Sequence, residues 1–352
     1  MNKSLILIII LSFGLLTGCI APKTQMVKVN EEQVRIERLK QQRLALTAFN
    51  QSLKRLFRVS YPLRQSAIAF CEDDQSLVPG FLIASRYTFK DDFHEAAKEA
   101  LNLDQYIRIA YLLDGTPAKL AGLQVNDRIL SVNQKTLGAN KEAISEFYKL
   151  VKAAPTDKKI NITLERNKQR IQTSFKPQKG CSYGMTLSNS DAVNAYADGR
   201  NVIITRGMMR FAQSDQELAL VVSHELAHNA MSHITAKQLN SLGGTLLDIA
   251  AAAAGVNTQG MFGQMGALVY SQAYENEADY VGLYIMARAG LKTDGAANFW
   301  RRMAVEHPAS ISSNHSSTHP ATAERFIAIE TTIDQIDQKK RSGMALMPEM
   351  KK

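Results

Sequence analysis

The sequence predicts an α+β protein, with a mainly helical domain that carries a small β-hairpin and with an inserted β-rich domain. From Ser214 onward, apolar residues recur at helical spacing between capping signals. Between residues 105 and 177 they instead alternate, as in half-buried strands. The dipeptide Asp198-Gly199, between two strand-like runs, predicts the hairpin. At 352 residues the chain is long enough for two or three domains.

The composition is ordinary for a soluble globular protein. Apolar residues make up 45% of the chain, charged residues make up 21%, and the formal net charge is +9. We interpret this charge as a solvated basic surface, and attraction to anionic membranes or acidic partners is the alternative. The sequence has no aromatic-basic cluster of the kind that reads single-stranded nucleic acid, so nucleic acid is not an expected partner.

The N-terminus has the pattern of an export signal. Lys3 precedes an apolar run, residues 5–16, that is too short to span a bilayer comfortably. The run ends in Leu-Thr-Gly-Cys, which resembles the lipobox of bacterial lipoproteins. The resemblance implies cleavage before Cys19 and acylation of that cysteine. Because Ile20 follows it, the resemblance also implies a periplasm-facing protein on the outer membrane. An ordinary signal peptide with a chance cysteine is the alternative.

A charged helix is predicted next, from Glu31 to about Phe57, since Val34, Leu39 and Leu46 recur at roughly helical spacing. We expect it to pack on the helical domain, and lying on the membrane is the alternative.

Cys71 and Cys181 remain once Cys19 is assigned to lipid. Export places these two cysteines in an oxidising compartment, which predicts that they form a disulfide. Two unpaired buried thiols are the alternative. Since one cysteine precedes the β-rich region and the other follows it, the bridge would clamp the base of an inserted domain.

The β-rich region has strand-like runs around Ile107–Leu113 and Ile160–Leu164, and a helical segment between them at 141–153. The stretch from Gly115 to Asn133 resembles the PDZ domains of bacterial proteases. That resemblance implies a C-terminal peptide as ligand, and a spacer or brace is the alternative.

The PDZ resemblance departs at Asn126 and Gln134, where glycine is usual. Because glutamine enters a left-handed turn less readily than asparagine, the turn after Asn133 is expected to be remodelled.

The helix predicted at Ser214 opens with a capping box, in which Glu217 is the fourth residue. It leads into His-Glu-Leu-Ala-His at 224–228. His224 and His228 are four residues apart, so both imidazoles lie on one helix face and can reach one metal ion. Glu225 lies beside them and can act as general base toward the attacking water. A polar helix with two surface histidines is the alternative, but the apolar neighbours indicate burial.

A catalytic zinc needs a third protein ligand and an open position. One metalloprotease class has glycine and histidine where this chain has Met231 and Ile234, so that class is excluded. His233 is nine residues beyond His224, about half a revolution around the helix, and is predicted to point elsewhere, as a structural or exposed residue. A later helix, starting near Tyr274 and ending at Gly290, carries Glu275 and Asp279 on one face.

These motifs resemble the gluzincin peptidase family that includes the HtpX membrane protease, CAAX prenyl proteases and the periplasmic BepA. The matching residues are HELAH at 224–228, ENEAD at 275–279 followed by Gly282, and STHP at 317–320 followed by Arg325. The resemblance covers about residues 181–330. It implies a zincin-type metallopeptidase domain with one zinc ion per chain.

The family pattern implies that His224, His228 and Glu275 are the zinc ligands and that Asp279 accepts the remaining N–H of a ligand histidine. It also makes His319 the candidate for stabilising the oxyanion. The strand-like residues Asn194, Ala195 and Tyr196 offer an edge to an extended peptide through main-chain hydrogen bonds, and an ordinary hairpin is the alternative.

We therefore expect a zinc endopeptidase of the bacterial envelope that cleaves unfolded, misfolded or misassembled exported proteins. The alternative is a PDZ-bearing adaptor or chaperone with a latent metal site. The expected organisation is a signal peptide at 1–18, a lipid tether and helix at 19–60, a segment packing on the peptidase at 61–104, a PDZ-like domain at 105–177, the peptidase at 178–335 and a tail at 336–352.

Overall fold

The computed structural model describes residues 24, 26–253, 256–262, 271–306 and 322–350. It contains two compact units, residues 1–41 and residues 42–352. The long helix α2 (Glu31–Ser66) begins in the first unit and ends in the second, beyond the predicted end at Phe57. Among the described helices, none combines the length and the apolar composition needed to cross a bilayer. Cys19 lies outside the described residues.

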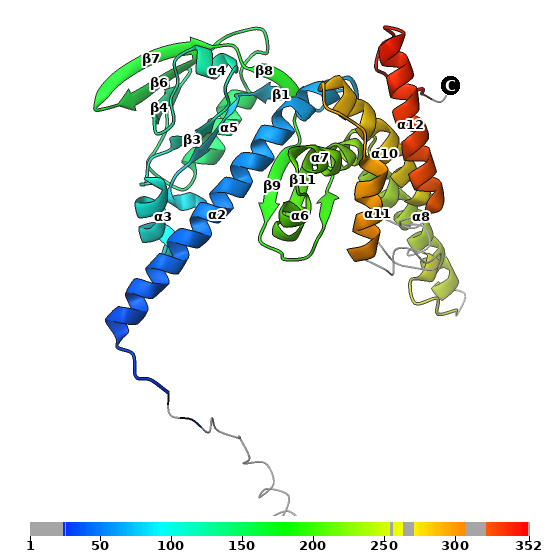
Figure 1. Ribbon diagram of the computed structural model, residues 1–352, viewed down its shortest axis with the longest axis horizontal. Helices are drawn as coiled ribbons and strands as arrows, with labels where there is room; N and C mark the ends of the chain where they lie inside the picture. Colours follow the sequence, from blue (N-terminus) through cyan, green and yellow to red (C-terminus); the bar gives the residue numbers. More distant parts are fainter. Residues whose placement is uncertain (1–23, 25, 254–255, 263–270, 307–321, 351–352) are drawn as a thin grey trace, which may run out of the picture. The chain divides into compact units, whose positions relative to one another are not determined.

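The β-rich domain is built on an antiparallel sheet with the strand order β2-β3-β4-β6-β7, in which the short β5 also pairs with β4. Helix α5 packs on this sheet, where Phe147 is fully buried and its ring lies 5.8 Å from that of Phe81. Figure 1 shows the domain in cyan and green. Its elements are β2 (Phe81–Ala84), η2 (Arg86–Thr88), η3 (Asp91–Phe93), α3 (His94–Leu101), β3 (Arg108–Leu112), α4 (Pro117–Leu120), β4 (Arg128–Val132), β5 (Lys135–Thr136), α5 (Ala143–Lys152), β6 (Ile160–Arg166) and β7 (Gln169–Phe175).

The turn after β4 is not remodelled, contrary to the prediction. Asn133 and Gln134 have φ angles of 46° and 69°, and Asn126 has a φ of 74°, all in the left-handed region that favours glycine. This backbone costs a residue with a side chain about 1–2 kcal/mol. The fold therefore holds Gln134 in the left-handed turn against its own preference.

The sheet of this domain also takes in a strand ahead of residue 105, the predicted start of the PDZ-like domain. Strand β2 pairs with β3, with Phe81 opposite Leu112, and Phe81 lies in the core of the β-rich domain. Part of 61–104 therefore belongs to the β-rich domain, whereas Leu63 and Phe70 lie in the core of the helical domain. A four-residue strand carries too little periodicity to reveal its partner, which lies more than 20 residues further along the chain.

The helical domain packs its helices beside a small sheet with the strand order β10-β11-β9. Strand β11 runs parallel to β9 and forms the predicted hairpin with β10. Figure 1 shows these strands beside α6 and α7. The elements are β9 (Gly184–Ser188), β10 (Ala195–Ala197), β11 (Asn201–Thr205), α6 (Arg206–Phe211), α7 (Asp215–Ala230), α8 (His233–Ala253), α10 (Ser271–Arg288), α11 (Ala296–Glu306) and α12 (Ala323–Arg341). The α+β prediction is confirmed.

The second half of α2 contributes to both domains. Leu56 and Leu63, two turns apart on one face, are fully buried in the core of the helical domain. Phe57 and Tyr61, one turn apart on another face, form a separate cluster with residues of the β-rich domain that include Leu113. The helix thus braces one domain against the other.

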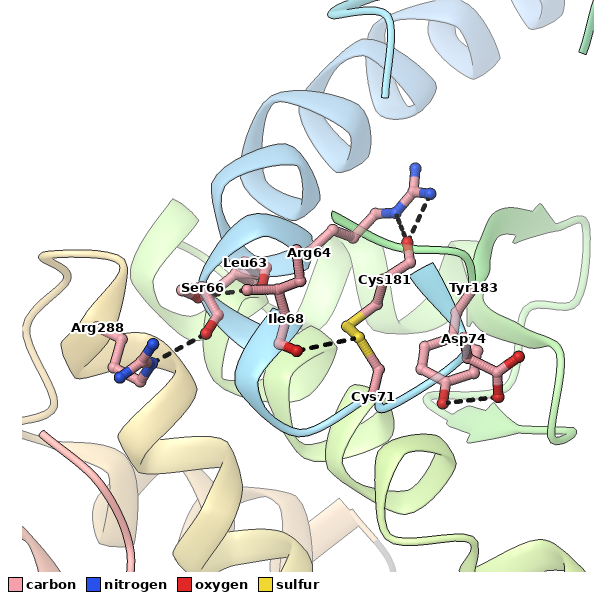
Figure 2. Close-up of a disulfide and its surroundings, with 9 residues drawn as sticks. All are labelled: Leu63, Arg64, Ser66, Ile68, Cys71, Asp74, Cys181, Tyr183 and Arg288. Atoms are coloured by element: carbon pink, nitrogen blue, oxygen red, sulfur yellow. Dashed lines mark hydrogen bonds between the residues drawn. A yellow bond between two sulfur atoms is a disulfide. The ribbon is translucent and has the colours of Figure 1, made fainter. Parts of the chain in front are cut away.

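The chain enters and leaves the β-rich domain through a two-stranded sheet. Strand β1 (Gln75–Val78) pairs with β8 (Gln178–Cys181), so that Gln75 lies opposite Cys181. Beside it, a disulfide joins Cys71, which follows the short helix η1 (Ala67–Ala69), to Cys181 (Figure 2). Arg64 of α2 donates two hydrogen bonds, of 2.9 and 2.8 Å, to the carbonyl oxygen of Cys181. Bridge, strand pair and helix together hold the base of the inserted domain.

Replacing both bridged cysteines by alanine (C71A/C181A) is expected to lower the free energy of unfolding by about 2–5 kcal/mol, because the bridge closes a long loop in the unfolded chain. The sequence separation of the two cysteines is 110 residues. Urea unfolding followed by the fluorescence of Trp300, the one tryptophan of the sequence, measures the loss. Reductant should destabilise the native protein by the same amount and leave the variant unchanged. A native protein insensitive to reductant would contradict the prediction.

Candidate metal centre

The helix that carries the two histidines, α7, starts at a fixed point. The Ser214 hydroxyl oxygen accepts the Glu217 N–H at 3.2 Å, as the capping signal predicts. The Glu217 carboxylate accepts the N–H of Gln213 at 2.7 Å, so it reaches one residue further back than a regular capping box. Arg302 of α11 holds the same carboxylate with bonds of 2.9 and 2.8 Å. These contacts fix the N-terminal end of α7.

Three buried side chains from α7 and α10 converge on one point. His224 Nε2 lies 3.2 Å from His228 Nε2 and 3.3 Å from Glu275 Oε2, and His228 Nε2 lies 3.3 Å from the other oxygen, Glu275 Oε1. Their residues are at most 2% exposed. Four ligands at 2.0–2.1 Å in a tetrahedron lie about 3.3–3.4 Å from one another, so these separations fit a zinc-sized tetrahedral ion. Within the described residues, this group alone could hold a metal.

Gly282 lets the two helices approach at this point. A Cβ atom added at Gly282 would lie 3.1 Å from the backbone nitrogen of His224 and 3.2 Å from its Cα. These distances are tighter than ordinary van der Waals contact, so a larger residue would push α10 away from α7. Glu275 lies two turns before Gly282 on α10, and the glycine therefore keeps its carboxylate within reach of the histidines.

Asp279 and Arg325 contact the convergent group and help to hold it in place. Asp279 Oδ1 lies 2.9 Å from His224 Nδ1, the contact that the family pattern implied. Arg325, near the start of α12, donates from Nε and Nη2 to Asp279 at 2.8 and 3.1 Å, and its Nη1 lies 3.6 Å from Glu275 Oε2. The sequence placed Arg325 in the family match without giving it a role. Only the packing of α12 on α10 reveals its partners.

The pKa values of the two histidines are shifted in opposite directions. Burial alone would lower the pKa of His224, but hydrogen bonds to Asp279 and Glu275 raise it to about 10. Burial lowers the pKa of His228 to about 4, although Glu275 acts in the opposite direction. Burial raises the pKa of Asp279, but Arg325 and His224 more than offset this and lower it overall. Two imidazoles this close are not both positively charged, and a divalent cation suits two neutral imidazoles and a carboxylate.

Glu225, the predicted base, lies beside His224 on α7 and is 1% exposed. It is not one of the three convergent residues, and its charge acts on both His228 and Arg325. His319, the predicted oxyanion residue, lies outside the described residues.

His233 is not one of the three convergent residues, as predicted, but it contacts one of them instead of pointing elsewhere. Helix α7 ends at Ala230, and Ser232 turns the chain with a φ of 56°. His233 therefore starts a new helix, α8, and helical-wheel counting from His224 does not apply. Its Nδ1 lies 2.9 Å from His228 Nδ1 and its Nε2 lies 2.8 Å from Glu277 Oε2.

One turn later on α8, Lys237 Nζ lies 3.9 Å from Glu275 Oε1. The start of α8 thus contacts two of the three convergent residues, His228 through His233 and Glu275 through Lys237.

Strand β10, which includes Ala195 and Tyr196, lies at the edge of its sheet. The Asn194 carbonyl and the Asp198 N–H both bond toward β11. Because backbone groups alternate along a strand, those of Ala195 and Ala197 point to the other edge. The Ala195 N–H is bonded to the Asn194 side chain at 2.9 Å, so its carbonyl and both groups of Ala197 are the ones directed outward.

The hairpin is tied to the last turn of α7. Asn229 Oδ1 accepts the Gly199 N–H at 2.8 Å, and Asn229 Nδ2 donates to the carbonyl oxygen of Asn201 at 3.0 Å. The turn of the hairpin is thereby tied to the residue that directly follows His228.

Two family models match the chain. The model of peptidase family M48 matches residues 156–333. The model of the PDZ domain matches residues 108–166, inside the β-rich domain.

Several proteases are similar over part of their length. The beta-barrel assembly-enhancing protease of Yersinia pestis is 30% identical over 135 residues, which cover 34% of this chain and 27% of that protein. The mitochondrial metalloendopeptidase OMA1 of Schizosaccharomyces pombe is 28% identical over 153 residues, or 41% of this chain and 44% of that protein. The metalloprotease LoiP of Escherichia coli is 29% identical over 141 residues, which cover 38% of this chain and 56% of that protein. The chain thus spans at most 56% of the length of these relatives.

Proposed function

Because the chain belongs to peptidase family M48, we propose that it is a zinc-dependent endopeptidase in which His224, His228 and Glu275 bind the zinc and Glu225 is the general base. The observation that carries this proposal is the convergence of three buried side chains, whose nitrogen–nitrogen and nitrogen–oxygen contacts are 3.2–3.3 Å long. The family membership favours an enzyme over an adaptor with a latent metal site.

When bound, the zinc supplies a Lewis acid for water activation and for polarisation of the scissile carbonyl. Glu225 takes the proton of the attacking water and delivers it to the leaving amine. Its carboxylate is held by the rigid helix α7, one residue from His224 and shielded from bulk solvent. Asp279 accepts the Nδ1 proton of His224 and so directs the other ring nitrogen toward the ligand group. Arg325 keeps Asp279 charged for that role.

We place the substrate along the outer edge of β10, where the carbonyl of Ala195 and both backbone groups of Ala197 can pair with an extended peptide. Main-chain pairing makes little demand on side chains, which suits unfolded or misassembled proteins as substrates. Tyr196, between these residues, is exposed and would lie beside the bound peptide. The position of His319 as oxyanion donor stays a prediction.

The envelope location belongs to the same proposal. The lipobox-like residues before Cys19 and the similarity to beta-barrel assembly-enhancing proteases both support a lipoprotein on the periplasmic side of the outer membrane. The PDZ domain would present a C-terminal peptide of a substrate or partner to the peptidase domain.

Removing the metal is expected to abolish cleavage of a reduced, carboxymethylated test protein. The purified chain should contain one zinc per molecule by elemental analysis, lose activity on dialysis against 1,10-phenanthroline and regain it with one equivalent of Zn²⁺. His228→Ala should lose the zinc. His94→Ala, at a histidine of α3 in the β-rich domain, is the matched control and should retain it. Cleavage that persists after complete metal removal would refute the proposal.

A further inference from the structure

We propose that His233 and Glu277 form a positioning pair that fixes the ring of His228 for metal binding, an inference that rests on the proposed zinc site. The pair joins three helices, because His228 lies on α7, His233 on α8 and Glu277 on α10.

The contacts run in one line through both rings. His228 turns Nε2 toward His224 and Glu275, and its Nδ1 lies 2.9 Å from His233 Nδ1. His233 in turn places Nε2 at 2.8 Å from Glu277 Oε2. Each ring nitrogen of the two histidines therefore has a different partner.

The carboxylate of Glu277, at the end of the line, determines which ring nitrogen of each histidine carries the proton. An ionised carboxylate only accepts hydrogen bonds, so His233 Nε2 carries a proton and donates it to Glu277. Neutral His233 then has a bare Nδ1, which accepts the proton on His228 Nδ1. This leaves His228 Nε2 without a proton, the state that a metal ligand requires.

The surroundings hold His233 in this orientation. Its ring stacks on Tyr274, with centroids 4.7 Å apart and planes at 25°, and the residue is 1% exposed. The left-handed backbone of Ser232 is what turns the ring back toward α7. Such a buried imidazole needs hydrogen-bond partners at both nitrogens, and the line of contacts supplies them.

The two zinc-binding histidines are thus oriented in different ways. His224 bonds directly to the buried carboxylate of Asp279. The Nδ1 of His228 is linked through a second imidazole to the carboxylate of Glu277, whose side chain is 47% exposed. Glu277 also lies two residues after Glu275 on α10, so the helix that brings the carboxylate ligand also brings the end of this line.

Three variants of the full chain test the pair. His233→Phe keeps an aromatic ring on Tyr274 and removes both hydrogen bonds. Glu277→Leu removes only the terminal acceptor, from a half-exposed position where loss of folding is not expected. Glu277→Gln retains a carbonyl oxygen that can accept from His233 Nε2. His94→Phe is the matched control, since its ring lies edge-on to Tyr87, 5.8 Å away, outside the site.

The readouts are the affinity for Zn²⁺, measured by competition with a chelating dye, and the visible d–d absorption of the Co²⁺-loaded protein. Loss of the hydrogen bond at the ring nitrogen of a ligand histidine that does not face the metal typically weakens metal binding by about 10–100-fold. We expect a loss in that range for His233→Phe, a smaller loss for Glu277→Leu, and a shifted Co²⁺ spectrum in both. Glu277→Gln should restore near-native affinity and spectrum, and His94→Phe should change neither.

Native affinity and spectra in both His233→Phe and Glu277→Leu would overturn the pair while leaving the zinc site intact. A loss in His233→Phe with no change in Glu277→Leu would also overturn it, because ring packing alone would then explain the effect. A native chain that binds no Zn²⁺ would instead refute the proposed metal site, and the pair with it.

Discussion

Glu225→Gln is expected to abolish peptide cleavage while the protein stays folded and keeps its zinc. The amide has nearly the same size as the carboxylate but cannot take a proton from the attacking water. General-base catalysis contributes about 10²–10⁴-fold to rates, so cleavage should fall by at least a hundredfold. Metal binding should persist because Glu225 is not one of the three convergent residues.

The test compares initial cleavage rates of an unfolded protein, zinc content and thermal unfolding for the variant and the native chain. Glu217→Gln is a matched control, since it makes the same change on the same helix, at the capped end. That control should keep zinc and cleave at a rate within a few-fold of native. A Glu225→Gln protein that retains a tenth or more of the native rate would show that another group is the base.

Arg325→Met is expected to lower the free energy of unfolding of the metal-free protein by about 3–5 kcal/mol, the usual cost of removing one partner from a buried ion pair. The Arg325 side chain is 3% exposed and its two carboxylate neighbours, Asp279 and Glu275, are no more than 4% exposed. Methionine fills much of the volume but removes the guanidinium from both buried carboxylates. Zinc should restore part of the loss, because it binds the folded state and compensates Glu275.

Urea unfolding followed by Trp300 fluorescence measures this effect, and the Arg325 guanidinium lies 5.5 Å from that ring. Arg302→Met is the matched control, because its ion pair with Glu217 is partly exposed, with the arginine side chain 37% accessible. Such pairs contribute about 0–1 kcal/mol. The double variant Asp279→Leu/Arg325→Met should lose less than the sum of its single variants. Equal losses in Arg325→Met and Arg302→Met would contradict the prediction.

The sequence alone determined the features that depend on local spacing. Two histidines four residues apart share a helix face wherever that helix packs, and the same holds for Glu275 and Asp279. The cap at Ser214, the hairpin at Asp198-Gly199 and the helix end at Gly290, whose φ is 74°, follow from the conformational preferences of single residues. These features were therefore predictable before any packing was known.

The tertiary structure decided which distant segments meet. It joined β2 to the β-rich sheet and brought Arg325 into hydrogen-bond contact with Asp279. It also turned the chain at Ser232, so that His233 contacts His228. None of these contacts has a local signal, because each depends on how buried surfaces from different elements fit together. The physical reason is that periodicity fixes which face of a helix or strand is buried, whereas the partner of that face is chosen by packing over the whole core.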